Sequence, residues 1–194
     1  MRIQQIVTVL LFFNVIPVLA AKPVPPIKIN PTVKAFDSIP KVQTERTFFV
    51  GTVQDTSLQR DETGVVGSTR IRRRKMATIV CNPPPAIVVK RSVEGLLINR
   101  GMKAPIPDSA DYTIRMLVLD FGLAESIRKL SQTMEANIAI QVSLIGREDS
   151  TPVRQYIIKS QNSKSTIDTS KYAESILRGA VENALKELIK SITR

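Results

Sequence analysis

Residues 134–145 read MEANIAIQVSLI and carry the clearest structural pattern in the chain. Every second residue is apolar, and the residues between them are mostly polar. A period of two places alternate side chains on opposite faces of a β-strand. The stretch therefore predicts a strand with one face on a core and the other toward solvent. The apolar set is Met134, Ala136, Ile138, Ile140, Val142 and Leu144.

The segments on either side of this strand extend it into a sheet. Gly146–Ser150 (GREDS) indicates a turn, and Pro152–Ser160 predicts the return strand of a hairpin. Ala110–Ala124 is apolar on both faces at its centre, which predicts a long strand in the middle of the sheet. Thr47–Val53 and Met76–Cys81 are rich in β-branched or apolar residues and predict two further strands.

Two helices are expected, and Ser170–Ile192 gives the stronger pattern. Its apolar residues recur at spacings of three and four, as on one face of a helix. We expect this face to pack on the sheet, with a partner-binding or membrane-surface helix as the alternative. Ala86–Arg100 predicts the other helix, and Gly101 suits its C-terminal end. The apolar stripe comprises Ala173, Ile176, Leu177, Ala180, Val181, Ala184, Leu185, Leu188, Ile189 and Ile192.

The order of these elements predicts an α+β fold. We expect a two-layer sandwich, in which two helices pack on one face of a mainly antiparallel sheet. Residues 46–194 suffice for one such domain. Before it, Ala21–Pro40 holds five prolines, and we expect residues 21–45 to form an extended or disordered arm outside the domain.

The first twenty residues predict an exported protein. Arg2 precedes the short apolar run Ile6–Phe13, and small residues follow near Ala20. This is the pattern of a cleavable signal peptide at residues 1–20, with cleavage after Ala21 as a variant. A membrane anchor is disfavoured because the apolar run is shorter than the roughly 20 residues that cross a bilayer. We expect no transmembrane segment after removal of the signal, and no lipidated cysteine at this site.

A basic run, STRIRRRKM at residues 68–76, is the most distinctive surface feature. It falls within Gln54–Lys75, a polar stretch expected to be a long loop or an irregular hairpin tip. The formal net charge of +11 favours anionic surfaces or acidic partners. Nucleic acid is not expected, because the chain is exported and has few aromatic residues for base stacking. The candidate interaction residues are Arg60, Arg70, Arg72, Arg73, Arg74 and Lys75.

Two other interpretations of the basic run remain open. It can be a solvated loop without function, or its arginines can pair with Asp61 and Glu62 in a structural role. If the arginines were structural, replacing them would unfold the protein. If they were merely solvated, replacing them would leave binding unchanged.

The residue inventory argues against an enzyme. The chain has no histidine, which excludes Ser-His-Asp and Cys-His catalysis and histidine-ligated metals. No phosphate-binding glycine motif occurs, and we expect no cofactor and no metal. Cys81, the one cysteine, is expected to be a buried apolar residue. Asp120 is the carboxylate expected to be half-buried, with a structural role.

Four stretches resemble the small outer-membrane lipoproteins of the YajG type. They are FFVGTVQDTS (48–57), VKRSVEGLLINRGM (89–102), ADYTIRMLVLDFGLAE (110–125) and AESILRGAVENALKELIKSI (173–192). The chain departs from that family in lacking the lipidated cysteine. It also has Asp55-Thr56-Ser57 where an acidic-x-Arg pattern is expected. The resemblance implies a protein of the cell envelope, and the family brings no settled biochemical role.

Together these features predict a non-enzymatic exported protein, periplasmic or associated with the outer membrane. We expect it to bind an envelope protein or an anionic envelope surface, with the basic loop 60–75 as the contact. One alternative is a protein released from the cell that acts on a host or a neighbour. A second is a carboxylate-based hydrolase, which would need two facing acidic side chains. The sequence leaves the oligomeric state open.

Overall fold

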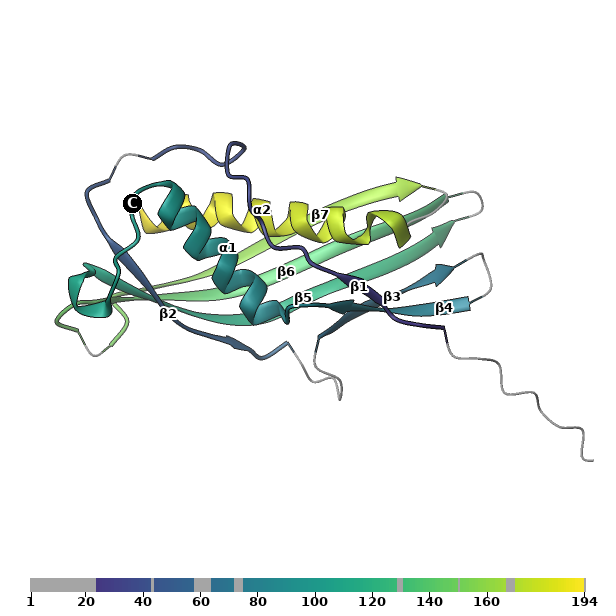
Figure 1. The fold of residues 1–194 in the computed structure, drawn as a ribbon, viewed down its shortest axis with the longest axis horizontal. Helices are drawn as coiled ribbons and strands as arrows, with labels where there is room; N and C mark the ends of the chain where they lie inside the picture. The colour runs from purple at the N-terminus through teal and green to yellow at the C-terminus, as the bar shows by residue number, and fades with distance from the viewer. Residues whose placement is uncertain are drawn as a thin grey trace, which may run out of the picture.

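The computed structural model has two layers, a seven-stranded sheet and two helices that cover one of its faces (Figure 1). It describes residues 24–42, 44–57, 64–71, 75–128, 131–149, 151–166 and 170–193. The strands are β1 (Ile27–Ile29), β2 (Phe48–Asp55), β3 (Val65–Ile71), β4 (Lys75–Cys81), β5 (Tyr112–Arg128), β6 (Ser131–Gly146) and β7 (Arg154–Thr166). The helices are α1 (Pro85–Asn99) and α2 (Ala173–Ile192), with short 3₁₀ turns η1 (Pro107–Ser109) and η2 (Ser170–Tyr172). The predicted α+β class and two-layer arrangement are confirmed.

The strands follow the order β1-β4-β3-β5-β6-β7, and β2 pairs with β5 beside this path. The long ladders β5–β6 and β6–β7 are antiparallel, as is the hairpin β3–β4. The pairs β1–β4, β2–β5 and β3–β5 are parallel. The sheet is therefore mixed and mostly antiparallel, and β5 is the strand that joins its parts.

The two strongest sequence patterns are confirmed. In β6 the predicted apolar set is buried, from Met134 to Leu144, while the alternate residues are partly exposed. In α2 the whole predicted stripe is buried, from Ala173 to Ile192. The helix lies against β6 and β7, so its apolar face packs on the sheet rather than awaiting a partner.

A β-bulge explains why β5 looked apolar on both faces. Val118 pairs with Ile140 and Asp120 pairs with Ala139, which leaves Leu119 as an extra residue. Apolar side chains face the helices at even positions before the bulge and at odd positions after it. The strand is central, as predicted, but its second face is open. Asp120 is exposed there, so the expectation that it is half-buried was wrong.

The polar stretch 54–75 contains a strand that the sequence did not reveal. Val65–Ile71 forms β3 and pairs with β4 from Val65 to Ile71. Of the two expected alternatives, the long loop is wrong over 65–71, where glycine, serine and arginine mask the alternation of a strand, and the stretch belongs instead to the β3–β4 hairpin. In the structure Val66 and Thr69 are fully buried, and the ladder with β4 supplies the backbone hydrogen bonds that local propensity does not.

Part of the proline-rich segment belongs to the domain, contrary to the expectation of a separate arm at 21–45. Ile27–Ile29 pairs with β4 at the sheet edge. Prolines beside an edge strand are tolerated because one side of such a strand has no ladder partner for its backbone N–H groups. Four apolar side chains from Ile29 onward enter the core. Phe36 lies over α1, where a Cβ at Gly95 would come within 2.8 Å of the ring. The four buried residues are Ile29, Val33, Phe36 and Ile39.

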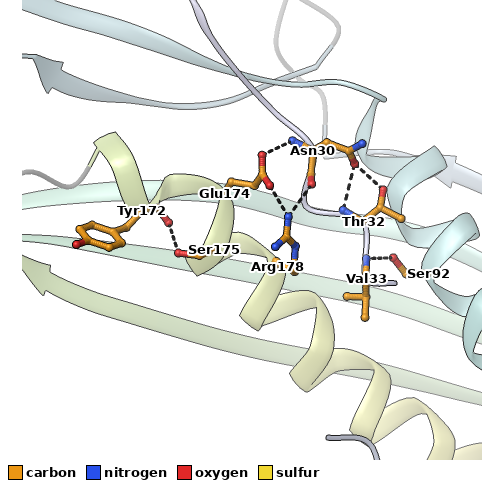
Figure 2. A network of polar contacts seen from close by, with 8 residues as sticks. All are labelled: Asn30, Thr32, Val33, Ser92, Tyr172, Glu174, Ser175 and Arg178. Carbon is orange, nitrogen blue, oxygen red and sulfur yellow. Dashed lines mark hydrogen bonds and ion pairs between the residues drawn. The ribbon is translucent and has the colours of Figure 1, made fainter. Parts of the chain in front are cut away.

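Polar contacts fix this segment across both helices (Figure 2). The backbone N–H of Asn30 donates to the Glu174 carboxylate at 3.1 Å, and Glu174 pairs with Arg178 on α2. The N–H of Val33 donates to the hydroxyl of Ser92 on α1 at 3.1 Å, in the buried interior. Farther along, the Arg100 guanidinium donates to the Phe36 carbonyl at 3.0 Å. Each contact satisfies a backbone group that a strand partner would otherwise take.

Helix α1 ends as predicted at Gly101. Its φ of +67° suits glycine, and the N–H groups of Gly101 and Met102 donate to Ile98 and Leu97. This is the Schellman arrangement, which satisfies the last carbonyls of a helix. At the other end Pro84 is the N-cap, without a side-chain cap, so Asn82 does not cap the helix.

Replacing Leu185 by alanine tests the packing of α2. Leu185 is 3% exposed, and we expect Leu185→Ala to lower the free energy of unfolding by about 2–5 kcal/mol. Ile98→Ala on the exposed side of α1 is the control and should change it by no more than about 0.5 kcal/mol. Urea unfolding measures both, and an equally small loss at Leu185 would contradict the packing.

A double-mutant cycle tests the contact between the N-terminal segment and α1. In an ordinary helix Gly→Ala stabilises by about 1 kcal/mol, but at Gly95 the new methyl would collide with Phe36. We expect Gly95→Ala to destabilise the protein. In a Phe36→Ala background the same change should stabilise it, and urea midpoints report the sign. The same sign in both backgrounds would show that Phe36 does not lie on Gly95.

Candidate interaction site

Of the six candidate interaction residues, Arg70 is the one whose side chain the structure describes, and it is exposed. Lys75 is described as the first residue of β4, without its side chain. Arg60, Arg72, Arg73 and Arg74 lie outside the described residues, as do their possible partners Asp61 and Glu62. The ladder on either side of 72–74 closes with Ile71 paired to Lys75, so the basic run begins in β3 and ends in β4.

The hairpin β3–β4 turns one set of side chains to the open face of the sheet. Arg70 is paired with Met76, and Ser68 with Thr78. All four are exposed, and Met76 keeps 54% of its surface accessible. A guanidinium, two hydroxyls and a thioether side chain therefore lie together. The opposite side of the hairpin is buried through Thr69, Ala77 and Ile79.

The hairpin joins the sheet at a single described point. Gly67 pairs with Leu123 of β5, and a Cβ at Gly67 would lie only 2.4 Å from the Leu123 carbonyl oxygen. A residue without a side chain is therefore required for this approach. Beyond it, the Glu125 carboxylate accepts from the Thr69 hydroxyl at 3.0 Å and from the Arg70 N–H at 2.9 Å. Glu125 thus replaces a strand carbonyl as acceptor.

A groove of about 640 Å³ opens between the hairpin and β5 beyond this point. We call it the β3–β5 groove. Its size is within the range of small-molecule sites. Ile127 on its β5 wall is 47% exposed. The groove is lined by Val65, Gly67, Ser68, Arg70, Met76, Thr78, Leu123, Ala124, Glu125 and Ile127.

The topology gathers other elements at the same end of the sheet. Strands β3, β5 and β7 run in one direction, so their C-terminal ends lie together, beside the start of α2 (Figure 1). The turn η2 contacts β3. Within this region the Lys164 ammonium lies 3.5 Å from the ring centroid of Tyr172, and Lys171 is exposed.

Sequence reasoning found Arg70 but missed the rest of the groove. Met76 was predicted to lie in a strand, but the side of the sheet to which it points was not predicted. Ile127 lay beyond the predicted end of the strand at 110–124. Glu125 and Gly67 matter through contacts with residues more than fifty positions away in the chain. The one local signal was Gly67 within a β-branched run, a pattern that marks close approach of two strands.

Other chemical groups are placed as follows. Within the described ranges, no set of three His, Cys, Asp or Glu residues is arranged to hold a metal ion. In the same ranges, no helix is long and apolar enough to cross a membrane. Cys81 is buried at the end of β4. Burial, and secondarily the charges of Asp55 and Glu174, raises the pKa of its thiol to about 12.

The high pKa of Cys81 predicts an inert thiol. Because the thiolate is the reactive form, we expect no reaction with Ellman's reagent at pH 8 in the native protein. Full reaction should follow in urea. The raised pKa also means that the unfolded thiol ionises first, so its contribution to stability falls as pH rises above 9.0. Rapid labelling of the native protein would contradict this placement.

Comparison with known sequences finds no matching protein family and no matching curated protein. Solved structures do match. A Xanthomonas campestris protein of family DUF330 has a TM-score of 0.62 at 16% identity, covering 86% of this chain and 94% of that one. The hypothetical protein CT253 of Chlamydia trachomatis scores 0.49 at 10% identity, covering 77% and 96%. A minor lipoprotein of Acinetobacter baumannii scores 0.43 at 16% identity, covering 57% and 87%. At such identities the first likeness shows a shared fold.

Proposed function

We propose that the protein is a non-enzymatic binding protein of the cell envelope. It is exported by residues 1–20 and docks through the β3–β4 hairpin. The membership of the YajG-type family is part of this proposal, supported by the four stretches that resemble it and by the fold. The partner is an anionic envelope component, because the run between β3 and β4 is the most strongly basic segment of the sequence.

The observation that carries the proposal is the junction of the hairpin with β5. One residue pair and the Glu125 bonds attach it there, and a groove opens beside it. On its open side the hairpin displays Arg70 and Met76. A projecting hairpin with a charged, partly apolar side is suited to recognition by surface complementarity.

Neutralising the basic run tests the proposal. We expect the triple variant Arg72→Gln, Arg73→Gln, Arg74→Gln to bind isolated envelope fragments more weakly than the unmodified protein. Its binding should also depend less on salt, because exposed charges are screened over about 8 Å at physiological ionic strength. Co-sedimentation over a salt series measures both quantities.

A matched control separates local from general charge. Lys90, Arg91 and Arg154 are exposed on α1 and β7, and their change to Gln removes the same formal charge elsewhere. This control should bind nearly as the unmodified protein does. Equal binding of the two triple variants would contradict a role for the hairpin. Unfolding of the Arg72–Arg74 variant, seen by circular dichroism, would mean that the run is structural.

A further inference from the structure

The β3–β5 groove combines exposed apolar side chains with a cation at its rim. Met76 and Ile127 are 54% and 47% exposed, and both line the groove, Met76 from the open face of the hairpin and Ile127 from the helix-facing side of β5. Arg70 is the ladder partner of Met76, so its guanidinium stands beside the thioether side chain. Ser68 and Thr78 add hydroxyl donors on the same face. Apolar surface next to guanidinium and hydroxyl donors is the chemistry of a phospholipid interface, where acyl chains meet phosphates.

The charge at this end of the sheet is predominantly positive in the described residues. Arg70 and Lys164 are exposed around the groove and η2. Two carboxylates lie near them. Glu125 faces inward to the Thr69 hydroxyl and the Arg70 N–H, and Glu135 pairs across the ladder with Ala124. Glu135 is partly exposed, so its charge offsets part of this excess, and Arg70 and Lys164 supply the outward positive charge that is complementary to phosphate.

An aromatic residue, Tyr172, lies at the same end of the domain as the groove. Tyr172 is half-buried in η2, and Lys164 lies over its ring. Since η2 contacts β3, this pair belongs to the same end as Arg70. Tyrosine is enriched where apolar lipid meets head groups, and lysine extends its ammonium group toward phosphate from such positions.

We propose that this end of the domain binds an anionic phospholipid bilayer and inserts Met76 and Ile127 among the acyl chains. Arg70 and Lys164 then lie at the level of the phosphates. The inference rests on the proposed function and names its envelope component as lipid. Stable membrane attachment takes two signals, here apolar insertion and charge, each of which is too weak alone.

Single-tryptophan reporters test the insertion, because the chain contains no tryptophan. We would make Met76→Trp and Ile127→Trp, with Ile157→Trp as the matched control. Ile157 is 61% exposed in the first half of β7, away from the groove. The probe is a vesicle of equal parts palmitoyl-oleoyl phosphatidylglycerol and phosphatidylcholine. Emission maximum and quenching by bromine-labelled lipid are recorded, and circular dichroism checks that each variant folds.

We expect the emission of Trp at 76 and 127 to shift to the blue and to be quenched, with no such change at 157. Vesicles of phosphatidylcholine alone should give no shift at physiological salt. In co-sedimentation, Arg70→Gln should weaken binding about fivefold, the value of one cation at an anionic surface. Met76→Ser should weaken it by a comparable factor, and Ile98→Ser, on exposed α1 surface, should not.

The outcomes separate this inference from the proposed function. Identical emission at 76, 127 and 157 would overturn the insertion. If the protein still bound envelope fragments through its basic run, the partner would be a protein or polymer and the proposed function would stand. Loss of binding to envelopes in every assay would overturn both.

Discussion

The β-bulge at Leu119 is the constraint on which the rest of the sheet depends. Without the bulge, regular alternation past Val118 would turn Phe121 and Leu123 away from the helices. With it, both halves of a seventeen-residue strand bury their apolar side chains on one side. The first half then pairs with β2 and the second meets β3, while β6 follows the whole length. The bulge therefore allows the edge of β5 opposite β6 to pair with two different strands, β2 and β3.

The sequence predicted those elements whose own pattern is complete. The apolar residues of Met134–Leu144 recur at every second position, and those of α2 recur at spacings of three and four. The buried face of each element could therefore be assigned without knowing its partners. The failures occur where a distant contact outweighs the local pattern. The proline-rich segment is ordered by Gly95, Ser92 and Arg100 of α1. Neither spacing nor composition within that segment reports on a helix sixty residues away.

The candidate site likewise has one part that the sequence predicts, the basic run, and one part that it does not, the groove. Arginines in a row are visible in any sequence, and they predict a basic segment at residues 68–76. The groove beside them depends on how far β3 follows β5 before the two strands separate. That distance is set by the pairing of Gly67 with Leu123 and by the acceptor supplied by Glu125. Register of this kind is a property of the assembled sheet, and local patterns do not encode it.

The single pairing of Gly67 with Leu123 also separates two parts of the domain that differ in their stability against local unfolding. On one side, β5, β6, β7 and α2 share long ladders and a continuous apolar core. On the other, the described links of the β3–β4 hairpin are one residue pair with β5, two bonds to Glu125, the edge strand β1 and the core contacts of Val66 and Ile79. Local openings follow such boundaries. Amide hydrogens of the hairpin should therefore exchange with solvent before those of β5 and β6. The groove can widen in this way while the body of the protein stays folded.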